Sequence, residues 1–210
     1  MTLPDALGVA FFVERMAETI IRRVHVQTKK KYLKDLTVKI GDLLFEMFIS
    51  HQEIQERTRE LAMKISNDDE SLIFVPVMTG AFYFSSSFLS YYSRPYQICC
   101  VTTSSYKGTK STGSVEIIHH KDPAIFEGKK VVILEDIIDT GLTVKELTRE
   151  LYLNGAREVI VVAMLFKPGK LEHDIPLHSV GFEIGDEFVI GFGLDYNESG
   201  RYLDDIYQLK

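Results

Sequence analysis

Two apolar runs separated by an amphipathic segment narrow the possible fold more than any other feature of this chain. Residues 131–134 read VVIL and residues 158–165 read EVIVVAML, and continuous apolar runs of this kind are typical of buried strands. Between them, Val144, Leu147 and Leu151 recur at helical spacing, and Asn154-Gly155 is a favourable helix end. Strand, helix and strand in this order form a βαβ unit, so we expect an α/β fold with a mostly parallel sheet flanked by helices.

The rest of the chain adds elements of both kinds. We expect strands over residues 71–77, 96–103 and 115–119, and helices over residues 54–65 and 81–92. Apolar residues also recur at helical spacing near the N-terminus, ahead of a basic run at 29–31, and these are Phe12, Met16, Ile20 and Val24. We therefore predict a helical extension over residues 1–35 and a domain over residues 36–210.

Composition excludes some classes of function. The chain has 210 residues and a formal net charge of −6, which argues against a broad nucleic-acid or membrane surface. Its two cysteines, Cys99 and Cys100, are neighbours in an apolar run, so they offer neither a CxxC motif nor a good disulfide. No apolar stretch is long enough to span a bilayer, and we expect a cytoplasmic protein.

Acidic residues follow the apolar run at 131–134. Glu135 and Asp136 come first, and Asp139 follows them and leads into Thr140-Gly141 and a helix. Ligands of parallel sheets sit beyond the carboxyl ends of strands, where helix N-termini offer amide donors to a phosphate. Like charges keep Glu135 and Asp136 from binding that phosphate, whereas magnesium or sugar hydroxyls would suit them. The stretch predicts a ligand with a phosphate, a sugar diol and a nearby metal.

The three acids also have a simpler interpretation, in which they bind no ligand. Asp139 could merely cap the helix while the other two acids are solvated. The dinucleotide pattern GxGxxG is absent, since Gly191 and Gly193 have no third glycine, and GxxxxGK[ST] is absent as well. The ordered set of acids on one strand, turn and helix favours a ligand site.

Residues 131–144, VVILEDIIDTGLTV, resemble the phosphoribosyl diphosphate (PRPP) motif of type I phosphoribosyltransferases, and EDIIDTG is similar to the form in the hypoxanthine-guanine branch. Four further segments agree in order with that branch. They are MTGA at 78–81, SYKGTKSTG at 105–113, LFKPGK at 165–170 and VGFEIGDEFVIGFGLDYNE at 180–198. The resemblance covers residues 36–210 and implies the type I fold, with a small purine-binding hood built mainly from about 165–210.

The same resemblance implies a reaction. A 5-phosphoribosyl group would pass from PRPP to hypoxanthine or guanine, giving IMP or GMP and diphosphate, with magnesium (Mg²⁺) as cofactor. The family further implies a homodimer or homotetramer. Two alternatives stay open at this point: a phosphoribosyltransferase for adenine or a pyrimidine, and a PRPP-sensing regulator that binds nucleic acid.

Roles at the phosphate end of the ligand are carried over residue by residue. Asp139 matches the general base near purine N7, and Glu135 and Asp136 match the ribose-diol pair with its metal. The predicted 5′-phosphate cup consists of Thr140, Gly141, Leu142 and Thr143. The predicted diphosphate contacts are Met78, Thr79, Gly80 and Arg201, with a cis peptide at Met78-Thr79. Leu142 and Thr79 stand where some family members carry lysine.

Roles at the purine end come from the same resemblance. Lys167 matches the donor to the purine 6-oxo group, Phe188 the stacking ring, and Val189 a main-chain contact to the purine edge. Asp195 matches a second magnesium site beside the purine. Ser105 and Tyr106 belong to the loop over residues 104–114 that is expected to close over the reaction and exclude water.

Overall fold

The computed structural model describes residues 36–65, 71–105, 115–119 and 121–210. The predicted extension over residues 1–35, Tyr106 and nearly all of the loop at 104–114 lie outside these ranges. Within the described part of the chain, every helix is too short or too polar to cross a membrane.

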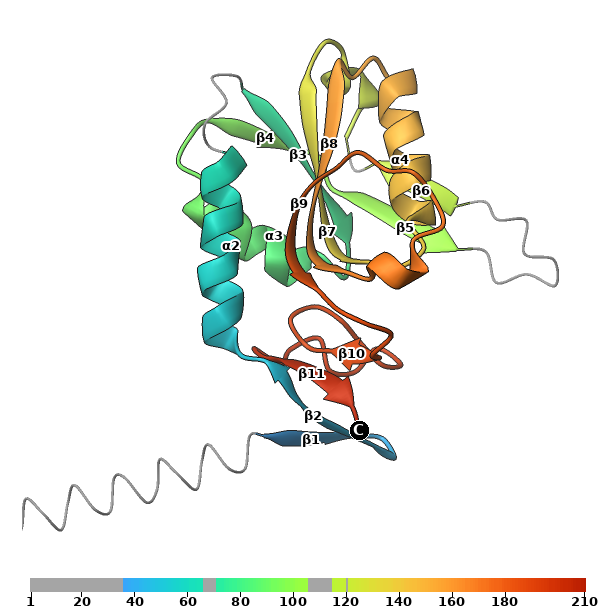
Figure 1. Ribbon diagram of the computed structural model, residues 1–210. Coiled ribbons are helices and arrows are strands. Elements are labelled where there is room, and N and C mark those ends of the chain that lie inside the picture. The colour runs from blue at the N-terminus through green and yellow to red at the C-terminus, as the bar shows by residue number, and fades with distance from the viewer. Residues whose placement is uncertain (1–35, 66–70, 106–114, 120) are drawn as a thin grey trace, which may run out of the picture.

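The centre of the fold is a seven-stranded sheet (Figure 1). Its path runs β6 (Val115–His119), β5 (Val101–Ser105), β3 (Leu72–Met78), β7 (Lys130–Ile138), β8 (Glu158–Phe166) and β9 (Leu177–Glu183), while β4 (Tyr96–Ile98) pairs with β3 beside this path. All neighbouring strands are parallel except β5 and β6. The predicted α/β fold with a mostly parallel sheet is confirmed.

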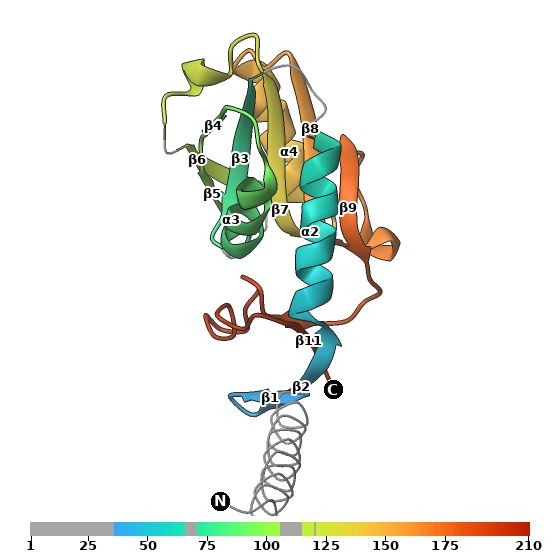
Figure 2. The ribbon, with the colours of Figure 1, turned by 90° about the vertical axis from the view of Figure 1, so that its left-hand side faces the viewer.

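Helices cover both faces of this sheet, as the two views show (Figures 1 and 2). On one face, α2 (His51–Ile65) and α3 (Phe82–Tyr91) pack on Phe74 and Val132 through side chains such as Ile54 and Phe88. On the other face, α4 (Leu142–Leu153) buries the predicted Val144, Leu147 and Leu151. Both faces of β3 and β7 are therefore apolar, which explains the continuous apolar runs in the sequence.

The expected strand over residues 96–103 is wrong in one respect, because it is two strands. β4 pairs with the first half of β3, whereas β5 pairs with Val77 and Met78 at its end. Between them the extended conformation is interrupted at Cys99 and Cys100. The Cys99 amide donates to the Phe74 carbonyl at 3.0 Å. The apolar run continues through the break, so composition gave no sign of it.

The strand expected over residues 131–134 is also longer than predicted. β7 continues through Glu135 and Asp136 to Ile138, and it pairs with β8 as far as Phe166. The acids are therefore part of the strand itself, with Glu135 paired opposite Ala163. The turn to α4 begins only at Asp139.

A smaller sheet lies below the central one in Figure 1. Its four strands run in the order β1 (Thr37–Ile40), β2 (Leu43–Ile49), β11 (Ile206–Leu209) and β10 (Val189–Ile190). Ile40, Phe45, Ile190 and Tyr207 form its own core. This sheet therefore joins both ends of the described chain, whereas the hood was expected mainly from residues 165–210. Two short 3₁₀ helices, η1 (Pro123–Phe126) and η2 (Pro168–Lys170), lie in the loops that follow β6 and β8.

The α3 helix offers a matched test of this core. Phe88 is fully buried and its ring packs edge-on against those of Phe74 and Phe84, whereas Phe82 on the same helix is 56% exposed. We expect Phe88→Ala to lower the free energy of unfolding by about 3–5 kcal/mol, since it empties a packed site. Phe82→Ala is the control and should change it by no more than about 0.5 kcal/mol. Urea unfolding of both variants measures the difference, and equal effects would contradict the burial described here.

Candidate active site

The turn from β7 into α4 forms a small open pocket. Glu135 and residues 137–144 line it, so it includes the predicted Thr140, Gly141, Leu142 and Thr143. Gly141 has a φ of 84°, which only glycine adopts readily, and a Cβ there would lie 2.9 Å from Leu171 Cδ1. The Leu142 amide donates to Thr140 Oγ1 at 3.3 Å at the helix start. Amide donors gathered at a helix N-terminus suit an anionic group.

Glu135 is the buried acid of this pocket. It is 7% exposed, and its Oε2 has no hydrogen-bond partner in the described part of the chain. Burial raises the pKa of the Glu135 carboxyl well above its ordinary value, and the neighbouring charge of Asp136 raises that pKa further. A carboxylate held in this way is suited to a cation or to hydroxyl donors.

Asp136 points to a different part of the site. A Cβ on Gly80 would lie 2.0 Å from Asp136 Oδ2, so the carboxylate is in close contact with the loop that follows β3. Burial raises the pKa of Asp136 to about 6, and the charge of Asp195 adds to the rise. Backbone amides of residues 136 and 137 and the charge of Arg201 act in the opposite direction. Glu135 thus faces the α4 pocket, while Asp136 lies within the electrostatic reach of Arg201 and Asp195.

The predicted diphosphate loop at Met78, Thr79 and Gly80 connects β3 to α3. Its Met78-Thr79 peptide is cis, as expected, and Thr79 is exposed. Gly193 approaches the loop from the C-terminal segment, since a Cβ there would lie 2.1 Å from the Gly80 carbonyl oxygen. Gly80 therefore lies between Asp136 and Gly193, and neither contact leaves room for a side chain.

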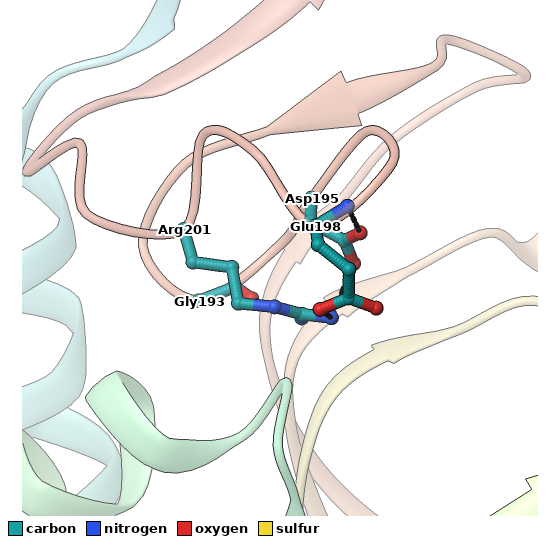
Figure 3. A network of polar contacts seen from close by, with 4 residues as sticks. All are labelled: Gly193, Asp195, Glu198 and Arg201. Carbon is teal, nitrogen blue, oxygen red and sulfur yellow. Dashed lines mark hydrogen bonds and ion pairs between the residues drawn. The ribbon is translucent and has the colours of Figure 1, made fainter.

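Arg201 lies beside this loop in a polar network with Gly193, Asp195 and Glu198 (Figure 3). Its Nη2 is 2.7 Å from Asp195 Oδ1 and 3.3 Å from Glu198 Oε2, and its Nη1 donates to the Gly193 carbonyl at 2.8 Å. The other Asp195 oxygen, Oδ2, accepts from the Glu198 amide at 2.8 Å. Two residues predicted to bind different parts of the ligand, Asp195 and Arg201, are thus paired with each other.

Asp139 and Lys167 lie on adjacent strand ends. The Lys167 amide donates to the Ile138 carbonyl at 2.9 Å, which aligns the residue after β8 with the end of β7. Lys167 is 6% exposed, and its ammonium has no recorded partner within the described ranges. Asp139 is half-exposed, and its Oδ1 is 4.0 Å from the ammonium of Lys170. Buried lysines normally have a partner, so this one is available for a polar ligand atom.

An aromatic cluster lies at the edge of the smaller sheet. The Phe188 ring is 44% exposed, with its centroid 6.3 Å from that of Phe45 and 5.9 Å from that of Tyr196. Val189 follows it as the buried start of β10, paired with Gln208. The exposed Phe188 ring is supported from two sides, and such a ring can stack on a planar ligand.

The structure thus brings most of the predicted residues to one end of the central sheet. Ser105 ends β5, and Tyr106 cannot be assessed because it lies outside the described residues. Sequence reasoning missed Gly193, Glu198 and Lys170 as parts of the site. A signal for Glu198 was present, because Asp195, Glu198 and Arg201 follow one another at intervals of three residues.

The predicted metal ligands are the carboxylates of Glu135, Asp136 and Asp195. No group of three or more acidic, histidine or cysteine side chains suited to a metal occurs in the described ranges. Magnesium, however, is commonly bound by one or two carboxylates together with substrate oxygens and water. The unpartnered Glu135 oxygen and the raised pKa of Asp136 fit such a role.

Comparison with known proteins agrees with this site. Residues 46–197 match the family model of the phosphoribosyl transferase domain. The chain is 33% identical over 169 residues to hypoxanthine-guanine phosphoribosyltransferase of Aquifex aeolicus, covering 79% of this chain and 94% of that protein. It is 37% identical to hypoxanthine phosphoribosyltransferase of Buchnera aphidicola, covering 75% and 92% of the two chains.

Solved structures give the same result. The crystal structure of a hypoxanthine phosphoribosyltransferase from Staphylococcus aureus superposes with a TM-score of 0.73 at 35% identity, covering 79% of this chain and 91% of that one. The matches cover about four fifths of this chain and nearly the full length of the relatives. The chain belongs to the phosphoribosyltransferase family, in its hypoxanthine-guanine branch.

Proposed function

We propose that this protein is a purine salvage enzyme that transfers the 5-phosphoribosyl group of PRPP to hypoxanthine or guanine. The products are IMP or GMP and diphosphate. One observation carries the proposal: relatives that bear this activity in their names match the chain at 33–37% identity over most of their length. The convergence of β7, the Gly80 loop and Arg201 at one end of the sheet supports it.

The phosphate groups of PRPP are assigned to two regions of the site. The 5′-phosphate binds in the pocket at residues 139–144, where amides at the start of α4 donate to it. The diphosphate binds at the loop of Met78, Thr79 and Gly80 and is contacted by Arg201. Glu135, in the first region, and Asp136, beside the second, accept hydrogen bonds from the ribose hydroxyls.

The purine binds between Phe188 and the strand ends. Lys167 donates to the 6-oxo group, Phe188 stacks on the ring, and the main chain at Val189 contacts the purine edge. Asp139 accepts the purine proton as the bond from the ring nitrogen to ribose C1′ forms and the bond from C1′ to diphosphate breaks. The side chain of Asp139 is half-exposed, and the Lys170 ammonium is 4.0 Å from its Oδ1. The carboxylate is therefore available for that proton.

Magnesium would be held by Glu135 and Asp136 near the ribose, with a second ion at Asp195, and its charge would stabilise the leaving diphosphate. We also assign a homodimer or homotetramer and a cytoplasmic location, as the family suggests. Residues 165–210 with the β1–β2 hairpin would form the purine-binding hood. The net charge of −6 gives no support to a regulator that binds nucleic acid.

The first prediction concerns substrate choice. Hypoxanthine and guanine should be converted to nucleotides in the presence of PRPP and magnesium, and adenine should not, because its 6-amino group offers no acceptor to Lys167. Lys167→Met should lower kcat/KM for hypoxanthine by about 10- to 100-fold, the usual effect of losing a hydrogen bond to a charged group. Steady-state assays with each base measure this, with exposed Lys129→Met as the matched control.

Two outcomes of this assay would contradict the proposal. Equal turnover of adenine and hypoxanthine would show that Lys167 does not select for the 6-oxo group. PRPP binding without turnover of any base would indicate a PRPP sensor in place of an enzyme.

The second prediction tests the general base. Asp139→Asn should lower kcat by about 100-fold or more, since positioned proton acceptors contribute at least that much. The dissociation constant of PRPP, measured by calorimetry, should stay within about 2-fold, because a base that acts on the purine contributes little to PRPP binding. Asp186→Asn is the control, because Asp186 Oδ1 contacts the same Lys170 ammonium at 3.9 Å. A similar loss of turnover in both variants would assign the effect to Lys170 instead.

The third prediction uses the raised pKa of Asp136, about 6 against an ordinary 3.8. The folded protein binds this proton more tightly than the unfolded chain, so the ionised carboxylate opposes folding above pH 6, and the penalty vanishes as the pH falls through 3.8. Asp136→Asn should therefore stabilise the ligand-free protein by about 1–3 kcal/mol at neutral pH and by less at pH 4.5. Urea unfolding at both pH values measures this, with exposed Asp174→Asn as control. A gain independent of pH would contradict the burial described for Asp136.

A further inference from the structure

The guanidinium of Arg201 is already bound by side chains and main chain of its own segment. Asp195 Oδ1 and Glu198 Oε2 both contact Nη2, at 2.7 and 3.3 Å, and Nη1 donates to the Gly193 carbonyl (Figure 3). Both carboxylates therefore contact Nη2, which is also the nitrogen required for two-point binding of an anion.

The planar shape of the guanidinium explains why Nη2 matters. Arginine binds phosphate in a forked, two-point contact that uses two neighbouring nitrogens. One such edge consists of Nε and Nη2 and the other of Nη1 and Nη2, because Cδ blocks the third side. Nη2 belongs to both edges. Since two carboxylates occupy it, Arg201 cannot make a forked contact until at least one of them moves away.

The backbone of the same segment holds Glu198 in place. Tyr196 and Ser199 exchange two main-chain hydrogen bonds of 2.8 and 3.0 Å, which closes a tight turn around Asn197 and Glu198. Both turn residues have positive φ, 50° and 61°, although neither is glycine. The Glu198 amide also donates to Asp195 Oδ2 at 2.8 Å. Glu198 therefore fixes Asp195 through its amide and Arg201 through its carboxylate.

We propose that Glu198 is a positioning residue that holds Arg201 against Asp195 and so competes with the diphosphate group for it. The proposal rests on the assignment of Arg201 to diphosphate made above. Glu198 lies outside the predicted contacts with substrate, and it acts only through Arg201. In this arrangement the Glu198 carboxylate and the diphosphate compete for the same nitrogen.

The direction in which diphosphate affinity changes when Glu198 is removed distinguishes a competing residue from one that prepares Arg201 for binding. A residue that prepares Arg201 for diphosphate would weaken binding when removed. A competing residue strengthens binding when removed, because Nη2 is then freed from one of its two partners. Exposed ion pairs of this kind are worth a few tenths to about 1 kcal/mol, so the change in affinity is about 2- to 5-fold.

The test is calorimetric titration of inorganic diphosphate into the full-length protein in metal-free buffer at about 0.15 M salt, where distant charges are largely screened. Glu198→Gln keeps the shape and the backbone amide but removes the carboxylate charge. We expect it to lower the dissociation constant by about 2- to 5-fold. An unchanged or raised constant would overturn the proposal.

Two controls show whether the gain passes through Arg201. Asp204→Asn removes an exposed carboxylate three residues beyond Arg201 whose side chain forms no hydrogen bond or ion pair with the described residues, and it should leave the constant unchanged. In an Arg201→Gln background, which should itself bind diphosphate more weakly, Glu198→Gln should have no further effect. A tightening that persists there, or that Asp204→Asn reproduces, would overturn the proposal in favour of general electrostatics.

The same titrations distinguish this proposal from the function on which it rests. Binding that Glu198→Gln fails to tighten overturns the role of Glu198 alone and leaves the proposed enzyme intact. A complete lack of diphosphate binding in the wild-type protein and in every variant overturns both the diphosphate site and the role of Glu198.

Discussion

Burial of carboxylates at the end of β7 is the constraint around which the site is organised. The strand does not stop where its apolar residues stop. It continues through Glu135 and Asp136, which are held where burial disfavours their charge and raises the pKa of each. Such an arrangement lowers stability unless a cation or hydroxyl donors complete it. The surrounding elements therefore need to admit a ligand close to the strand end, and the two glycine contacts at Gly80 show how closely the backbone approaches.

Those contacts also link the two sheets. Gly80 follows the central strand β3, and Gly193 follows β10 of the smaller sheet, yet a Cβ on Gly193 would overlap the Gly80 carbonyl oxygen. The loop at Met78-Thr79 and the segment that follows β10 are thereby held against each other by backbone packing. Side-chain flexibility contributes little to this contact, since neither residue has a side chain.

Local sequence signals were sufficient for much of the fold. The apolar faces of α2 and α4, and the strands β3 and β8, follow from periodicity and composition because their burial is determined by neighbours along the chain. Features set by distant pairing were not accessible in this way. The break at Cys99-Cys100 depends on how two strands divide β3 between them, and the β1–β2 hairpin enters the smaller sheet by pairing with β11, far along the chain.

In the site too, some features could be predicted from the local sequence and others depend on distant contacts. Residue types and spacing pointed to Glu135, Asp136 and Asp139 as ligand contacts, because acids after an apolar run are unusual. That Glu135 and Asp136 face different parts of the site could not be read from their order, since it depends on the strand continuing to Ile138. The contact of Arg201 with Glu198 depends in turn on a left-handed turn at residues 197 and 198, a conformation that asparagine adopts more readily than glutamate does.

Glu135 and Asp136 are neighbours in β7, but they lie in two separate regions of the site. Glu135 belongs to the pocket at the start of α4, while Asp136 lies beside Gly80. In the arrangement proposed above, a molecule with a single phosphate would occupy only one of these regions. PRPP would join the two halves covalently, so that binding of one half would raise the effective concentration of the other. Compounds that span β7 gain from this geometry, and compounds confined to one side of the strand do not.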